Sequence, residues 1–106
     1  MDSPGIVVLI TASKEDEAAK IAQALVGARL AACVNMIRNI RSIYRWQNKI
    51  EDEAEVLIIA KTQRHLFKSL AEKVRELHSY KVPEIIAIPI IEGSEDYLNW
   101  LKDVTG

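Results

Sequence analysis

Residues 31–62 of the chain, AACVNMIRNIRSIYRWQNKIEDEAEVLIIAKT, decide its fold. Polar and apolar residues alternate over residues 50–56, and an apolar run follows over residues 56–60. This pattern is typical of a strand that is first half-buried and then covered on both faces. The periodicity of residues 36–46 is mixed, but their β-branched and aromatic side chains favour a strand. We therefore predict a two-stranded hairpin that turns near residues 47–49.

The predicted hairpin is long for a chain of 106 residues. An arm of ~15 residues at ~3.3 Å per residue spans roughly 50 Å. We therefore expect the tip to leave its own core and to pack on another copy of the chain. Tyr44 and Trp46, near the tip, belong to the residue types that are enriched in interface cores. Asn48 suits the left-handed backbone of a tight turn.

Charges on the two arms are expected to pair across the turn. Arg41 is predicted to lie opposite Glu53 or Glu55, and opposite charges across a ladder contribute roughly 0.2–1 kcal/mol per pair. The acidic run Glu51–Glu55 is interpreted as the solvated face of the hairpin and not as a catalytic cluster.

The segments around the hairpin predict two more strands and three helices. Residues 5–12 and 85–91 are apolar runs of strand length. Pro89 cannot donate to a ladder, so its strand belongs at an edge or carries a bulge. The second helix ends around His78, and Pro83 favours a loop before the last strand. The helices are predicted to start at three N-cap residues: Ser13, Thr62 and Ser94.

The resulting order is β-α-β-β-α-β with an added C-terminal helix. Two helices on one face of a four-stranded antiparallel sheet make the α+β, ferredoxin-like sandwich. Its usual strand order, 4-1-3-2, places the strand of Pro89 at an edge, as the proline requires. We predict a single domain that spans residues 1–106.

The composition excludes several classes of function. A net charge of -1 and the lack of a Lys/Arg cluster argue against nucleic acid and membrane surfaces as partners. No apolar run approaches the ~18 residues of a membrane span. A single cysteine, Cys33, allows no intramolecular disulfide and fits a reducing compartment. The start, MDSPGIVV, lacks the features of a signal peptide, so a cytoplasmic protein is expected.

Catalytic motifs are missing from the sequence, and a non-enzymatic role without an organic cofactor is expected. Cys33 and His78 would form a nucleophile–base pair only if the fold brought them together. Without such a pairing, Cys33 is interpreted as a small buried residue. His78 is either a capping residue at a helix C-terminus or a metal or anion ligand. Lys61 is either a solvated charge or the cation of a ligand cleft between subunits.

Five stretches of the sequence match the motifs of a known family in the same order. They are VVLITAS (7–13), ARLAACVN (28–35), SIYRWQNKIE (42–51), LHSYKVPEIIAIPI (77–90) and YLNWL (97–101). Through them the sequence resembles the CutA family of divalent-cation tolerance proteins over nearly its whole length. The resemblance implies a subunit related in fold to the PII signalling proteins. It also implies a homotrimer in which the hairpin of residues 31–62 joins the sheets of neighbouring subunits.

The metal ligands that the resemblance implies are only partly present. In copper-binding members, a Cys and a His-His pair stand at the positions of Ile10, Leu77 and His78, so only His78 remains. One imidazole binds copper or zinc weakly, because copper sites collect several N or S ligands. The family's cleft pattern still matches at seven residues: Cys33, Tyr44, Trp46, Lys61, Tyr80, Glu84 and Trp100.

Two functions follow from these observations, and an enzyme that uses the same cleft is the third class considered. The first is a homotrimer that binds divalent cations weakly, through His78, and contributes to copper tolerance. The alternative is a PII-like sensor that binds a small anion near Lys61 in the cleft between subunits and signals to an unknown protein partner.

Overall fold

The computed structural model describes residues 3–106, and its order of elements confirms the predicted ferredoxin-like fold. The four strands form one antiparallel sheet in the order β2-β3-β1-β4, which places β4 and its Pro89 at an edge as predicted. None of the helices in this range is long and apolar enough to cross a membrane. The elements are β1 (Gly5–Ala12), α1 (Glu15–Gly27), β2 (Cys33–Trp46), β3 (Lys49–Gln63), the 3₁₀ turn η1 (Arg64–Leu66), α2 (Phe67–Leu77), β4 (Ile85–Pro89) and α3 (Glu95–Asp103).

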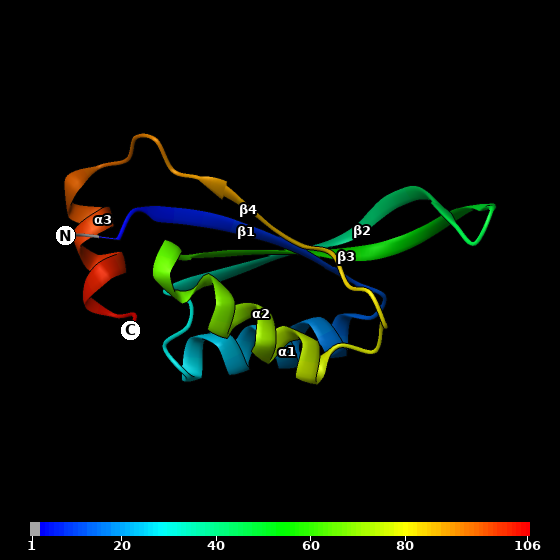
Figure 1. Cartoon of the computed structure of the whole chain (residues 1–106), viewed down its shortest axis with the longest axis horizontal. Helices are drawn as coiled ribbons and strands as arrows, with labels where there is room; N and C mark the ends of the chain where they lie inside the picture. The colour runs from blue at the N-terminus through cyan, green and yellow to red at the C-terminus, as the bar shows by residue number, and fades with distance from the viewer. Residues whose placement is uncertain (1–2) are drawn as a thin grey trace.

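Helices α1 and α2 lie side by side on one face of the sheet, and α3 lies at the end of the sheet near both termini (Figure 1). The core fills the space between this face and the two helices. Alternate residues of β1 and β3, such as Val8 and Ile58, are fully buried against Ile21 of α1 and Leu70 of α2. Burying a side chain of this kind contributes ~1.5–3 kcal/mol, so this layer holds the fold together.

The second face of the sheet is also apolar but is much more exposed. We call it the open face. It carries the strand residues that alternate with the core residues, and it includes Ile37, Ile86 and Ile88. Their exposed fractions are 47%, 51% and 49%. An apolar face left in this state is typical of a surface that another protein covers.

The β2–β3 hairpin projects beyond the helices, as predicted from its length (Figure 1). The molecule is 45 Å long and only 25 × 22 Å across. Gln47 and Asn48 form a two-residue turn in which both have positive φ, 49° and 67°. This is the type I′ geometry that matches the twist of the strands, and Asn48 takes the predicted left-handed conformation. A bulge between Ile37 and Ile40, with Asn39 at φ 57°, bends β2 where the projecting part begins.

The predicted register of the hairpin is wrong by one residue. Arg41 lies opposite Ala54, because the turn has two residues and not three. The guanidinium pairs instead with the diagonal neighbour Asp52, with Nε 2.9 Å from Oδ1 and Nη2 2.6 Å from Oδ2. This pair lowers the pKa of Asp52 from its ordinary value.

Two of the three predicted helix caps are also wrong. Helix α1 starts one residue later than expected, after Lys14, and no side chain caps it. Thr62 is a fully buried residue of β3, because this strand pairs with β1 as far as Gln63, and α2 begins only at Phe67. Ser94 does cap α3, since its Oγ accepts a hydrogen bond from the Tyr97 amide at 3.4 Å.

Candidate functional site

His78 follows the end of α2 and is buried, with both ring nitrogens engaged. Its Nε2 lies 2.7 Å from the carbonyl oxygen of Thr11, and its Nδ1 accepts a hydrogen bond from the Tyr80 amide at 3.0 Å. The proton therefore lies on Nε2, and the imidazole is neutral. The carboxylate of Glu17 is 3.6 Å from Nδ1. His78 thus ties the loop after α2 to the end of β1.

The surroundings of His78 do not fit a copper or zinc centre built from several ligands of one subunit. Over residues 3–106, no three His, Cys, Asp or Glu side chains gather closely enough to hold a metal ion. Ile10 is fully buried in the core, and Leu77 packs against it. A metal ion at His78 would have to displace one of the two hydrogen bonds of the ring.

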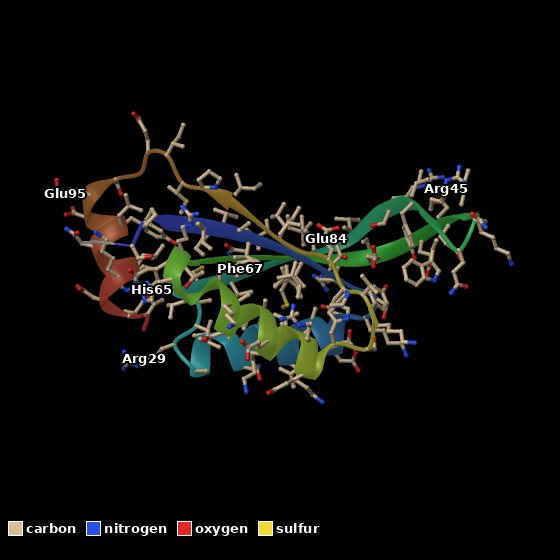
Figure 2. The ribbon with its side chains drawn as sticks, viewed as in Figure 1. Arg29, Arg45, His65, Phe67, Glu84 and Glu95 are labelled. Carbon is tan, nitrogen blue, oxygen red and sulfur yellow. The ribbon has the colours of Figure 1, made fainter. Side chains whose placement is uncertain are left out.

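A pocket of about 760 Å³ lies where the projecting hairpin meets the loop after α2. We call it the hairpin-base pocket. It brings together four of the predicted cleft residues, which are Tyr44, Trp46, Tyr80 and Glu84. Figure 2 shows Glu84 where the loop passes the base of the hairpin and Arg45 on the projecting part.

Two tyrosine hydroxyls in this pocket donate to carboxylates. The Tyr80 hydroxyl lies 2.7 Å from Oε2 of Glu55, and the Tyr44 hydroxyl lies 2.6 Å from Oε1 of Glu53. Burial and the bond to Glu55 raise the pKa of Tyr80 well above its ordinary value. The bond to Glu53, with burial and the nearby acidic groups, raises the pKa of Tyr44 to about 12. Both phenols therefore remain protonated donors at neutral pH.

The other predicted cleft residues form a second group at the opposite end of β2. Cys33 pairs across the ladder with Lys61, and both side chains donate to Oδ1 of Asn35. Trp100 is in ring contact with Tyr97, with centroids 5.4 Å apart, and Tyr97 in turn lies beside Cys33. We call this the Cys33–Lys61 group. Burial raises the pKa of Tyr97.

The two groups are far apart within one subunit. Tyr44 lies eleven positions after Cys33 along β2, which is roughly 35 Å at ~3.3 Å per residue. Cys33 and His78 are not brought together either, because Cys33 pairs with Lys61, opposite Val7, whereas His78 contacts Thr11. The structure therefore gives no nucleophile–base pair between Cys33 and His78.

Three residues in and around the pocket were not predicted as site residues from the sequence. Glu55 was assigned to a solvated face, but it is buried at 7% exposure beneath Tyr80. Its position directly before the apolar run of β3 was the available signal. Thr11 contributes a backbone carbonyl, and Glu17 reaches His78 from α1. Neither contact has a sequence signature.

Comparison with known proteins places this geometry in a family. The chain matches the CutA1 divalent ion tolerance protein family over residues 6–104. It is 52% identical over 100 residues to "Divalent-cation tolerance protein CutA" of Thermus thermophilus, covering 94% of this chain and 97% of that protein. It is 44% identical over 102 residues to "Protein CutA, chloroplastic" of Arabidopsis thaliana, covering 96% of this chain but only 56% of that longer relative.

A solved structure agrees with the sequence comparison. The divalent cation tolerance protein Cut A1 of Thermus thermophilus superimposes with a TM-score of 0.94 at 51% identity, covering 96% of this chain and 99% of that one. The chain therefore belongs to the CutA1 divalent ion tolerance protein family.

Proposed function

We propose that this protein acts in divalent-cation tolerance, including tolerance of copper, as a homotrimer that binds divalent cations weakly. The observation that carries the proposal is the family match over residues 6–104, together with the Thermus thermophilus relative that is named a divalent-cation tolerance protein. No catalytic role is assigned to the protein.

Weak metal binding agrees with the geometry around His78. The ring nitrogen Nδ1 and the Glu17 carboxylate are 3.6 Å apart and supply two donors. Copper sites generally collect several nitrogen or sulfur ligands, so two donors support only low affinity. A metal ion at Nδ1 would also break the hydrogen bond that this nitrogen accepts from the Tyr80 amide, and this cost lowers the affinity further.

Calorimetric titration of the chelator-treated protein with copper(II) and zinc(II) tests the metal proposal. We expect saturable binding that His78→Ala removes and that His65→Ala leaves unchanged, because His65 is the second of only two histidines and lies exposed in η1. No binding tighter than about 1 mM, or roughly −4 kcal/mol, would contradict it. Equal binding by His78→Ala and wild type would exclude His78 as the ligand.

The homotrimer proposal is supported by the open face and by the hairpin. Ile86 and Ile88 on the open face are 51% and 49% exposed, and Ile43 and Ile50 on the projecting part, which lie on the opposite face of the sheet, are 62% and 67% exposed. Exposed apolar side chains gathered in this way mark interaction sites in soluble proteins. Another copy of the chain is the natural partner because soluble oligomers are mostly symmetric assemblies of one subunit. Three copies are proposed from the family resemblance.

The second candidate function is a sensor of a small anion that signals to a protein partner. The Cys33–Lys61 group favours it, because Lys61 lies with Asn35 and Tyr97 on the face that a second copy would cover. A ligand that binds only the folded protein raises its unfolding temperature. Inorganic phosphate should therefore raise the unfolding temperature of wild type but not of Lys61→Ala. Equal shifts in both proteins would remove this candidate.

The cytoplasm is the proposed compartment. The single cysteine supports it, because a thiol persists in a reducing environment. The Arabidopsis thaliana relative is described as chloroplastic and the Archaeoglobus fulgidus structure as periplasmic, so compartments differ within the family. Cell fractionation with an antibody against the protein tests this placement, and recovery outside the cytoplasmic fraction would contradict it.

A further inference from the structure

A continuous chain of contacts joins the first turn of α1 to the base of the projecting hairpin. It starts at the carboxylate of Glu17, which accepts a hydrogen bond from the Ser79 hydroxyl at 3.1 Å and lies 3.6 Å from Nδ1 of His78. The same Nδ1 accepts the hydrogen bond from the Tyr80 amide. The chain ends in β3, where the Tyr80 hydroxyl donates to Glu55 at 2.7 Å. Tyr80 therefore links His78 to the hairpin.

Glu55 marks the point where β3 leaves the core. Residues 52–54 before it are exposed, whereas Glu55 and Val56 are buried. A glutamate is rarely buried to this extent unless it is paired, and its Oε2 accepts the hydrogen bond from Tyr80. Displacing Tyr80 would leave the buried carboxylate without this donor, which is costly. The carboxylate would then turn toward water, and the base of the hairpin would lose its tie to the loop after α2.

A second tie between the hairpin and α1 is weaker. Arg38, in the bulge of β2, lies with Nη1 3.3 Å from Oε1 of Glu15. The two side chains are 69% and 56% exposed, and solvent screens such a pair. The Tyr80–Glu55 bond, which reaches a buried carboxylate, is therefore the stronger of these two ties.

Nδ1 of His78 has one lone pair, and this lone pair serves either of two partners. In the structure it accepts from the Tyr80 amide. A divalent cation held by His78 and Glu17 would need the same lone pair. The two donors fit such an ion, because their separation of 3.6 Å is below the sum of about 4.2 Å for two ordinary zinc–ligand distances. Cation binding and the contact with Tyr80 therefore exclude each other.

We propose that cation binding at His78 and assembly through the hairpin oppose each other, and that Tyr80 couples them. This rests on the proposed function, in which His78 binds divalent cations and another copy covers the hairpin. When a cation takes the lone pair of His78, the Tyr80 amide loses its acceptor, Tyr80 moves away from Glu55, and the base of the hairpin is freed. A freed hairpin must be ordered again on contact with another copy, which weakens assembly. Such coupling is reciprocal, so assembly also weakens cation binding.

Calorimetric titration with zinc(II) tests the role of Tyr80, which is not a cation ligand in this account. Tyr80→Phe removes the bond to Glu55 but keeps the ring and the amide, so zinc displaces less and should bind at least threefold more tightly than to wild type. Glu72→Gln, which changes an exposed acid on α2, is the control and should bind zinc as wild type does. Equal or weaker binding by Tyr80→Phe overturns the coupling and leaves the proposed function intact. No zinc binding by any of the three proteins overturns both.

Hydrogen exchange followed by mass spectrometry tests the hairpin itself and needs no dissociation of the assembly. Saturating zinc(II) should speed exchange in peptides from residues 40–55 at least threefold and leave peptides from β1 unchanged. In Tyr80→Phe the hairpin peptides should exchange fast with or without zinc. Unchanged exchange in zinc-saturated wild type overturns the proposal. If Tyr80→Phe does not fold, Glu55→Gln serves in both experiments with the same directions expected, because a neutral amide accepts a weaker hydrogen bond than a carboxylate.

Discussion

The two halves of β3 show how differently one strand can be stabilised. Between Val56 and Gln63 the strand lies between β1 and β2, and its core side chains are covered by α1 and α2. From Lys49 to Ala54 it pairs with β2 alone and is mostly exposed. Apolar burial stabilises the C-terminal half, Val56 to Gln63. The N-terminal, projecting half is stabilised by the turn, the Arg41–Asp52 pair and the Tyr44–Glu53 hydrogen bond.

An isolated two-stranded hairpin is marginally stable in water at best. Exposed pairs such as Arg41–Asp52 add little, because solvent screens them and two long side chains must be ordered. The apolar residues of the projecting half, Ile43 and Ile50, are also unfavourable in water. The difference between the halves therefore supports the proposal that the hairpin gains stability from a partner, which the buried half does not need.

The largest expected effect comes from comparing the same substitution, isoleucine to alanine, in the two halves of β3. Ile58→Ala removes a fully buried side chain and should lower the free energy of unfolding by ~2–5 kcal/mol. Ile50→Ala removes a side chain that is 67% exposed and should change it by less than ~0.5 kcal/mol in the dissociated chain. Urea unfolding at low protein concentration measures both. Similar losses in the two variants would contradict the comparison.

A smaller effect is expected at the turn. Asn48→Val places a β-branched residue at φ 67° and should cost ~1–2 kcal/mol, whereas asparagine adopts this conformation readily. Asn48→Gly is the matched control and should leave stability equal or slightly higher. Thermal unfolding of the three proteins separates these outcomes. A Val variant as stable as wild type would show that the turn is not held in the left-handed conformation.

The smallest effect concerns the pH dependence of the projecting half. The pKa of Tyr44 is about 12 in the folded protein, against an ordinary value of 10.0. The Tyr44–Glu53 interaction is therefore fully present below pH ~10 and is lost as the pH rises through the folded pKa.

Absorbance titration of tyrosinate, with Tyr44→Phe as the reference, measures this pKa. In Glu53→Gln the pKa should move back toward its ordinary value. A Tyr44 that titrates at its ordinary value in wild type would show that the Glu53 bond does not form.

Much of the fold was predictable because burial leaves a pattern in the sequence. The bounds of β1 follow from one apolar run between Gly5 and Ala12, and the edge position of β4 follows from Pro89. The register of the hairpin was not predictable, since turns of two or three residues fit the same alternation. Thr62 was misassigned because pairing with β1, which is distant in sequence, extends β3 past it.

The site was less predictable than the fold. The seven cleft residues were recognisable as family motifs, but their separation into two groups depends on the length of β2. The environment of His78 depends on a backbone carbonyl of Thr11, and every residue type supplies such a carbonyl. The burial of Glu55 depends on the loop that carries Tyr80, which is distant in sequence.

Sedimentation velocity at micromolar concentration tests the central claim, that other copies cover the open face and the hairpin. We predict a species of three copies for wild type. Ile88→Glu, which places a charge on the open face, should sediment as a folded monomer with an unchanged circular dichroism spectrum. The exposed change Glu72→Gln is the control and should assemble like wild type. A folded wild-type monomer under these conditions would contradict the account.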